Sequence, residues 1–277
     1  VDLLPPAPGS LAVVDVNGNP VASPVLPSRT VPLKLSGATD TFGIDSAVAQ
    51  VSTDSGVTWS GSTAFVGSEP RTATISSAPT GTFMVRGLVT DNAGLTAATN
   101  PVTVVVDLDA PIVTGVTTTA SGSKKAGDTV AITVTFSEPV TSTGVSQLQL
   151  ETGSTDRDAT CPPVTVSSTL TCNYTVVNGD VSPHLDYVST GALHGTMTDA
   201  AGNPAVLTLP ALAQSGLSTQ QTIVIDTTAP TVSGVATSVI PGTYGIGAVI
   251  PIDVGFTEPV VVDVSGGIPQ LTLETGG

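Results

Sequence analysis

Aromatic residues make up only 3% of this 277-residue sequence and charged residues only 10%, and it contains just two cysteines and two histidines. So few aromatic side chains argue against a stacking platform for sugars. Seven basic residues against 22 acidic ones give a net charge of −15, which disfavours binding to nucleic acid or to anionic lipid. No run of 18 apolar residues occurs, so we expect no membrane insertion in this segment.

Motifs for catalysis are also missing. No serine lies in a Gly-x-Ser-x-Gly turn, and no Gly-Lys-Ser/Thr loop is present to hold a phosphate. The two histidines, His184 and His194, lie in a loop-rich stretch whose spacing matches no zinc site. The sequence therefore predicts no catalytic residue, no zinc site and no enzyme.

One short motif has an enzymatic association. Residues 52–59, Ser-x-Asp-x-Gly-x-Thr-Trp, fit the Asp-box pattern of sialidases and related propellers. A sialidase needs several blades and a cluster of arginines for the substrate carboxylate, whereas the four arginines here are scattered. We therefore expect a structural hairpin in which Asp54 and Ser52 bond the turn and Trp59 packs beneath it.

The abundant residues favour β-structure. The 29 glycines and 22 prolines punctuate short segments rich in Val and Thr, which suit pleated strands. Residues 129–136 alternate strictly and place Val130, Ile132, Val134 and Phe136 on one face. No long stretch carries a clean helical stripe. Roughly seven strands per hundred-odd residues predict an all-β chain of tandem immunoglobulin-like β-sandwich domains joined by short linkers.

Internal repeats set the expected boundaries. Residues 106–111 recur as 225–230, with Asp107 and Asp226 lying 119 positions apart, and a weaker copy forms residues 1–6. The segments Phe-Ser/Thr-Glu-Pro-Val and Leu-x-Leu-Glu-Thr-Gly follow both of the later linkers. We predict three parts, here called unit one (residues 1–109), unit two (110–228) and unit three (229–277). Unit three is expected to be the truncated N-terminal half of a further repeat and the least stable part.

The linkers at 107–111 and 226–230, together with the loops at 90–94 and 198–203, resemble those of bacterial Ig-like repeats in large surface proteins and adhesins. That resemblance implies an extracellular or cell-surface location and a calcium-dependent stalk, with neighbouring repeats as partners, and it names no ligand. Two positions depart from the pattern: Leu4-Pro5 in the first linker, and Leu95 where Asn is usual.

Acidic residues recur where a sandwich would bring them together. The linker entering a domain, its B–C loop and its F–G loop meet at one pole, and converging carboxylates repel one another unless a cation binds. Calcium takes six to eight oxygen ligands and fits such a set. The alternative is that these residues only cap turns. The candidate calcium ligands are Asp2, Asp40 and Asp91 for unit one; Asp107, Asp109, Glu138 and Asp199 for unit two; and Asp226 and Glu258 for unit three.

Cys161 and Cys172 lie 11 residues apart around the turn-like stretch 167–169, so a hairpin would bring them within reach of a disulfide. Two buried free thiols are the alternative.

The leading functional hypothesis is a structural spacer of a bacterial adhesin or surface protein, stiffened by interdomain calcium, with any host ligand bound by other domains. The competing hypotheses are a ligand-binding module that recognises a glycan or a host protein, and an accessory fragment of a glycosidase. Fold class alone does not choose among them.

Overall fold

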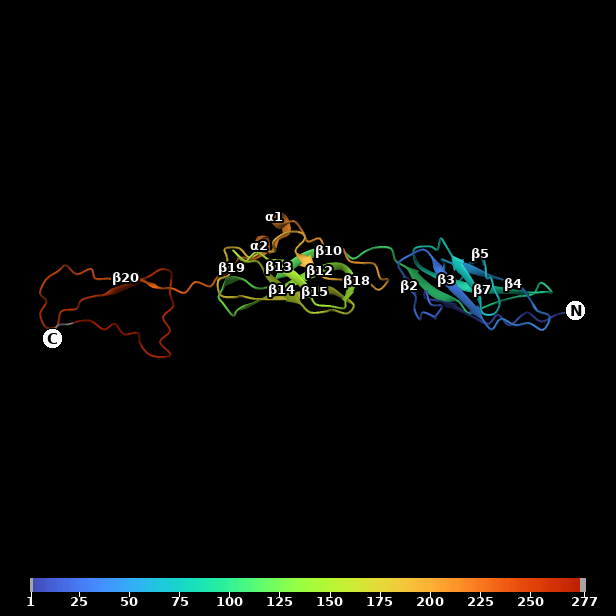
Figure 1. Cartoon of the computed structure of the whole chain (residues 1–277), viewed down its shortest axis with the longest axis horizontal. Helices are drawn as coiled ribbons and strands as arrows, with labels where there is room; N and C mark the ends of the chain where they lie inside the picture. Colours follow the sequence, from blue (N-terminus) through green and yellow to red (C-terminus); the bar gives the residue numbers. More distant parts are fainter. Residues whose placement is uncertain (1, 275–277) are drawn as a thin grey trace.

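The computed structural model describes residues 2–274, and the chain is almost entirely β-strand. Three parts follow one another along the long axis of the molecule, with the two termini at opposite ends (Figure 1). Two separate hydrophobic cores form, one built from residues in the range 11–106 and the other from residues in the range 116–225. The all-β prediction is confirmed.

Unit one is a sandwich of two sheets. The smaller sheet has the order β1-β3-β6, and the larger has the order β2-β9-β7-β4-β5 with β8 paired to β7. The strands are β1 (Ser10–Val13), β2 (Val25–Leu26), β3 (Val31–Ser36), β4 (Ile44–Ser52), β5 (Ser60–Ala64), β6 (Arg71–Ile75), β7 (Gly81–Asp91), β8 (Thr96–Ala98) and β9 (Val102–Val106). Alternate residues of β3 (Val31, Leu33 and Leu35) are buried against the facing sheet, as period-2 patterning requires.

Unit two is also built of two sheets, a larger one of order β10-β12-β15-β14-β13-β17, with β18 on β12, and a smaller one of order β11-β19-β16. The strands are β10 (Val113–Thr118), β11 (Gly122–Lys124), β12 (Thr129–Ser142), β13 (Ser146–Leu150), β14 (Arg157–Cys161), β15 (Ser167–Thr175), β16 (Val181–Ser182), β17 (Leu193–His194), β18 (Met197–Thr198) and β19 (Ile223–Asp226). Val130, Ile132, Val134 and Phe136 share one buried face of β12, as the alternation predicts.

The first strand of each unit crosses from one sheet to the other. In unit one, β1 pairs antiparallel with β3 and then β2 pairs parallel with β9. In unit two, β10 pairs antiparallel with β12 and then β11 pairs parallel with β19. The last strand of each unit, β9 or β19, is therefore the parallel partner of the second strand of that unit.

Two short helices, α1 (Leu212–Ser215) and α2 (Leu217–Gln220), interrupt the strands of unit two. Their sequence carries no helical stripe, and a distant contact positions α2: the Asp186 carboxylate accepts the backbone N–H groups of Leu217 and Ser218. No helix among the described residues is long and apolar enough to span a membrane.

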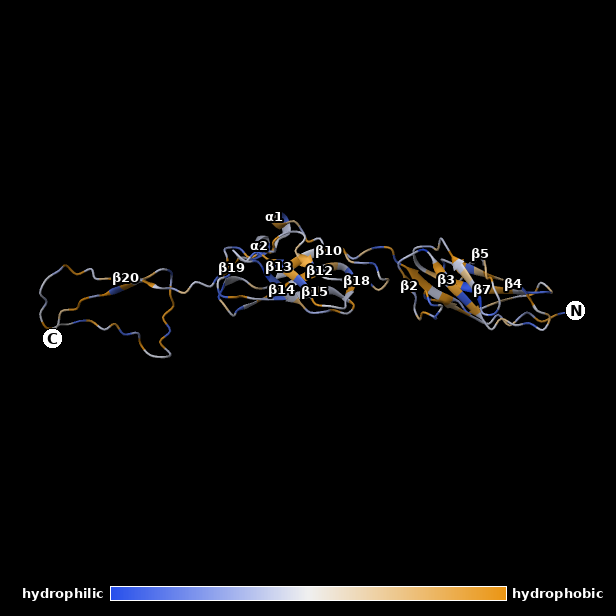
Figure 2. Ribbon diagram, viewed as in Figure 1, coloured by the Kyte–Doolittle hydropathy of each residue, from blue (hydrophilic) through white to orange (hydrophobic). Residues whose placement is uncertain are grey.

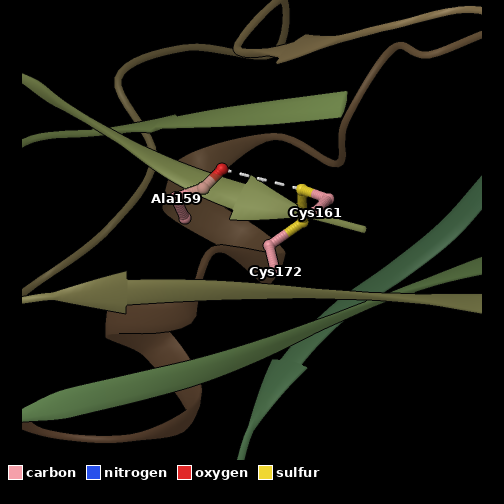
Figure 3. Close-up of a disulfide and its surroundings, with 3 residues drawn as sticks. All are labelled: Ala159, Cys161 and Cys172. Atoms are coloured by element: carbon pink, nitrogen blue, oxygen red, sulfur yellow. Dashed lines mark hydrogen bonds between the residues drawn. A yellow bond between two sulfur atoms is a disulfide. The ribbon is translucent and has the colours of Figure 1, made fainter. Parts of the chain in front are cut away.

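A disulfide joins Cys161 of β14 to Cys172 of β15, with both residues fully buried in the core of unit two (Figure 3). The Ala159 carbonyl oxygen lies 3.7 Å from the Cys161 sulfur. The expected turn at 167–169 is wrong, because these residues begin β15 and the chain turns at 162–166. The pair of prolines at 162–163 ends the preceding strand, since proline cannot donate to the ladder.

Unit three contains only one pair of strands in its described part, β20 (Val232–Ala236) and β21 (Asp253–Phe256). No hydrophobic cluster is found there within residues 229–274, and most of its large apolar side chains are exposed. Figure 2 shows these apolar segments along an open loop of chain, without a second layer over them.

Candidate cation sites at the unit entrances

Three carboxylates converge where the linker enters unit two. One oxygen from each of Asp107, Glu138 and Asp199 lies within 4.8 Å of the others. Asp107 directly follows β9, Glu138 lies in β12, and Asp199 directly follows β18. The sequence placed Glu138 in a loop, but β12 runs continuously past it, with its pairing to β15 shifting register between Thr135 and Val140. The irregularity presents Glu138 to the linker without ending the strand.

The backbone around this cluster is fixed by local hydrogen bonds. Asp199 Oδ1 accepts the N–H groups of Gly202 at 2.7 Å and Asn203 at 2.8 Å, and Asp107 Oδ1 accepts that of Asp109 at 3.1 Å. Turn capping by Asp, the alternative considered above, is therefore present at both positions. The second oxygen of Asp107 is not used in this capping, and Asp199 Oδ2, which accepts one hydrogen bond from Asn203, keeps a further lone pair, so capping and cation binding are compatible.

Mutual repulsion within the cluster acts on Glu138. Burial, followed by the negative charges of Asp107, Asp199 and Asp109, raises the pKa of Glu138 above its usual value. Each such charge pair costs on the order of 1–4 kcal/mol at these separations, depending on the local dielectric. A divalent cation at this position would reverse the sign of that interaction.

Asn203 bridges the linker to the same turn. Its Nδ2 atom lies 3.1 Å from the carbonyl oxygen of Asp107, 3.1 Å from that of Asp109, and 2.8 Å from Asp199 Oδ2. The sequence placed Asp109 among the ligands by its side chain, but that carboxylate is exposed and is not one of the three converging groups. Asp109 instead contributes its backbone carbonyl to the amide of Asn203.

A second cluster lies at the entrance of unit one, formed by Asp2, Asp40 and Asp91, whose carboxylate oxygens also lie within 4.8 Å of one another. Asp91 is only 1% exposed; its Oδ1 accepts the N–H groups of Ala93 and Leu95, while its Oδ2 has no hydrogen-bond partner. Asp2 Oδ2 is likewise buried without a partner. Buried carboxylate oxygens normally find a donor or a metal.

The loops that carry Asp91 and Asp199 differ at the residue four positions further along the chain. Leu95 occupies the place that Asn203 holds in unit two, so no amide reaches Asp91 Oδ2. Asn92 connects a different pair of loops, donating from Nδ2 to the Phe42 carbonyl oxygen at 2.7 Å. The departure at Leu95 was visible in the sequence, but its consequence for the neighbouring carboxylate was not.

At the entrance of unit three, Asp226 and Glu258 line one hollow together with Asp128, Lys124 and Lys125 of unit two. Glu258 Oε1 is buried without a hydrogen-bond partner, and Asp226 Oδ1 accepts the N–H of Thr228. No third acidic residue joins them in a described metal-type group. The two lysine charges beside these carboxylates make this hollow less favourable for a cation than the other two clusters.

The Asp-box hairpin forms between β4 and β5. Asp54 accepts hydrogen bonds from the Ser52 hydroxyl and the Thr58 backbone, and the Trp59 indole N–H donates to the Gly56 carbonyl. Hydrogen bonds from the Thr58 side chain, and then from its backbone, lower the pKa of Asp54 to about 2. Arg86 lies 4.3 Å from the Trp59 ring centroid. The side chains of Ser52, Asp54 and Trp59 thus form their hydrogen bonds within the turn itself.

No protein-family model matches the chain, and no curated protein sequence matches it. Solved structures do. The fibronectin(III)-like modules of Clostridium thermocellum CbhA align at 13% identity over 78% of this chain and 93% of theirs, with a TM-score of 0.33. The D00-D0 domain of intimin aligns at 15% identity over 71% of this chain and 96% of its own, with a TM-score of 0.25.

A third match is SGBP-B of Bacteroides ovatus, solved in complex with a mixed-linkage heptasaccharide. It aligns at 16% identity over 87% of this chain and 52% of its own, with a TM-score of 0.21. The fold of units one and two as Ig-like β-sandwich modules rests on their own paired sheets.

Proposed function

We propose that this chain is a non-catalytic spacer of an extracellular bacterial surface protein, in which calcium binds at the entrances of unit one and unit two. The observation that carries the proposal is the origin of the three carboxylates at the second entrance. One comes from the linker and two come from the unit that follows it. A cation held by all three would tie the linker to unit two.

The donor set fits calcium. All six residues of the two clusters are aspartate or glutamate, and hard oxygen ligands are what calcium prefers. Asp91 Oδ2 and Asp2 Oδ2 are buried oxygens that lack a donor, which a bound cation would satisfy. Asp107, Glu138 and Asp199 would hold the ion in unit two, and Asp2, Asp40 and Asp91 would hold it in unit one.

Calcium binding would restrict the motion of the linker strongly while adding little to the free energy of unfolding. Extracellular calcium modules bind with dissociation constants of about 10⁻⁴–10⁻³ M. At a calcium concentration about ten times the dissociation constant, binding adds only about 1.4 kcal/mol to the free energy of unfolding. Fixing the linker to the next sandwich, however, removes the freedom of the joint. Units that contact only their neighbours in a row suit a spacer.

Isothermal titration calorimetry with calcium tests the proposal. We expect about two ions per chain, in the millimolar range or tighter. Asp107→Asn should remove the site of unit two and Asp91→Asn the site of unit one. The control is Asp158→Asn, which removes an equal charge from an exposed position on β14. Equal calcium binding by all four proteins, or none by the unmodified chain, would refute the proposal.

A further inference from the structure

A positive charge lies on the outer face of unit one without an acidic partner. Arg86 is in β7, on the face opposite to the buried side chains of that strand, and it is only partly exposed. Among the described residues the one ion pair joins Arg157 to Asp180. Arg86 therefore has no carboxylate at contact distance within residues 2–274, although the chain contains 22 acidic residues against 7 basic ones.

Neutral groups hold this guanidinium in place instead. Its Nε donates to Gln50 Oε1 at 3.0 Å, and Gln50 lies directly opposite Arg86 on the neighbouring strand β4. The guanidinium carbon lies 4.3 Å from the centroid of the Trp59 ring. The indole N–H of Trp59 donates to the Gly56 carbonyl at 3.0 Å, which fixes the ring to the hairpin. Stacking on the ring and the Nε hydrogen bond together orient the planar guanidinium.

The other donors of the two polar side chains are unused. An arginine carries its remaining N–H groups on the Nη atoms, and neither Nη of Arg86 donates to a protein atom in the described part of the chain. Gln50 accepts through its oxygen, and its Nε2 likewise has no described partner. A guanidinium that is always charged and held in one orientation, with free Nη groups, matches the two oxygens of a carboxylate.

Side chains that this chain uses sparingly gather around Arg86. Trp59 is its one tryptophan, and Met84 lies on the same face of β7, whereas the other methionine, Met197, is buried in unit two. A Cβ built on Gly56 would lie 3.6 Å from the Met84 sulfur and 3.6 Å from the Trp59 ring, so both side chains lie beside the hairpin turn. Apolar surface next to a few convergent polar groups is the usual composition of a ligand site.

The position in the sheet favours a glycan over a peptide. Strands β7 and β4 are interior strands in the order β2-β9-β7-β4-β5, so their backbone groups are already paired on both sides. A peptide that binds to a sheet commonly adds a strand to a free edge, and no such edge lies at Arg86. A ligand here is recognised by side chains alone. A sugar that carries a carboxylate offers them an anion and hydroxyl groups close together.

We propose that Arg86, Gln50 and Trp59 form a binding site for an acidic glycan. The Nη groups of Arg86 bind the carboxylate of a uronic acid, Gln50 Nε2 donates to a neighbouring hydroxyl, and Trp59 holds the guanidinium in position. The site goes beyond the spacer role and needs no calcium, because Asp91, at the end of the same strand, faces the opposite side of the sheet.

Titration of the full chain with a galacturonic acid trimer, followed by Trp59 fluorescence, tests the site. A chelator is present throughout, because uronates also bind calcium, so the result is independent of the cation clusters. The matched ligands are the methyl ester of the same trimer, which lacks the charges, and a glutamate trimer, which carries carboxylates on a peptide. We expect the acid to bind with a dissociation constant on the order of 1 mM, and both matched ligands to bind at least about tenfold more weakly.

Three variants locate the binding. Arg86→Gln should weaken binding of the acid by about tenfold or more, because the charged donors are lost. Arg86→Lys keeps the charge without the planar pair of donors and should give an intermediate affinity. The control is Arg71→Gln, which removes an equal charge from β6 in the other sheet of unit one and should bind as the unmodified chain does. Slow hydrogen exchange in β7 shows that each variant is folded.

The proposal is overturned if the unmodified chain does not bind the acid, or if the methyl ester or the glutamate trimer binds equally well. It is also overturned if Arg71→Gln weakens binding as much as Arg86→Gln does. Should Arg86→Gln lose the slow exchange of β7, Arg86→Lys decides the question, and unchanged affinity in that variant then contradicts the site.

Discussion

Unit one and unit two each bring three carboxylates together at the entrance of the sandwich. They differ in whether the carboxylate oxygens there receive hydrogen bonds from the protein. In unit two, Asn203 satisfies Asp199 Oδ2 and holds two linker carbonyls, so the linker is fastened by protein atoms alone. In unit one, Leu95 stands in that place and two carboxylate oxygens are left without donors. The entrance of unit one should therefore depend on a cation more than the entrance of unit two.

The units also differ in how they fix the turn that follows β6 in unit one and β15 in unit two. Unit two uses a buried carboxylate: Asp180 accepts the Tyr174 hydroxyl, the Arg157 Nε and the Val177 N–H. Unit one uses Arg29, whose Nε donates to the Ala78 carbonyl. Burial alone would raise the pKa of Asp180, but these hydrogen bonds and the Arg157 charge outweigh burial and lower it.

Removing Asp180 should therefore give the largest effect and confine it to unit two. Asp180→Ala leaves Tyr174 and Arg157 without their partner and should cost about 3–5 kcal/mol of unfolding free energy. Hydrogen exchange in β12 and β15 measures unit two, while the fluorescence of Trp59, the one tryptophan, measures unit one. A matching loss in unit one would show that the two sandwiches do not unfold separately.

The same residue predicts a pH dependence. Because the pKa of Asp180 is lowered in the fold, its contribution is present above its unfolded pKa of about 3.9 and is lost as pH falls through the lower folded value. The stability difference between the unmodified chain and Asp180→Asn should accordingly shrink below about pH 4. A difference that stays constant down to pH 2 would contradict this origin.

Reduction of the Cys161–Cys172 disulfide should be the next largest effect. Releasing a loop of this length costs about 3 kcal/mol on the chain-entropy model. Urea unfolding with and without reductant measures it, with unit two followed by exchange and unit one by Trp59. Unit one contains neither cysteine, so an equal loss there would contradict the assignment.

Asn203→Leu should make the entrance of unit two resemble that of unit one, where Leu95 holds the equivalent position. It removes the two N–H donors of the amide, which lie within reach of two carbonyls and one carboxylate, and should cost about 1–3 kcal/mol. Without calcium, exchange at the linker residues 107–112 should rise. Asn203→Asp, which has the same size but no donor, serves as the matched variant and should loosen the linker at least as much. No change in either variant would mean that the amide bridge is not what holds the linker.

The reciprocal change should have the smallest effect. Leu95→Asn offers an amide to Asp91 Oδ2 and should stabilise unit one by about 1 kcal/mol in the absence of calcium, as measured by Trp59 fluorescence in urea. A destabilisation of similar size would show that Leu95 contributes packing that outweighs the gained hydrogen bond.

Sequence patterning predicted the parts of this structure that rest on local rules. Alternation in β12 and the repeated linkers indicated the sandwiches. The sequence also predicted that acidic residues converge at each entrance, Asp91 with its neighbours in unit one and Asp107, Glu138 and Asp199 in unit two. What escaped prediction depends on contacts between distant residues. The bulged course of β12 past Glu138, the positioning of α2 by Asp186, and the reach of Asn203 to the linker 94 and 96 residues away all arise only once the fold brings those groups together.

Amide hydrogen exchange at the entrance of unit two, with calcium and with a chelator, tests the central claim most directly. The N–H groups of Asp109 and Asn203 donate to the carboxylates of Asp107 and Asp199. At calcium about ten times the dissociation constant, their exchange should slow by about tenfold in the unmodified chain. In the Glu138→Gln variant, which lacks one of the three charges, the slowing should disappear. If calcium and chelator give the same exchange in the unmodified chain, the acidic residues cap turns and nothing more, and the account of a cation-fixed joint is wrong.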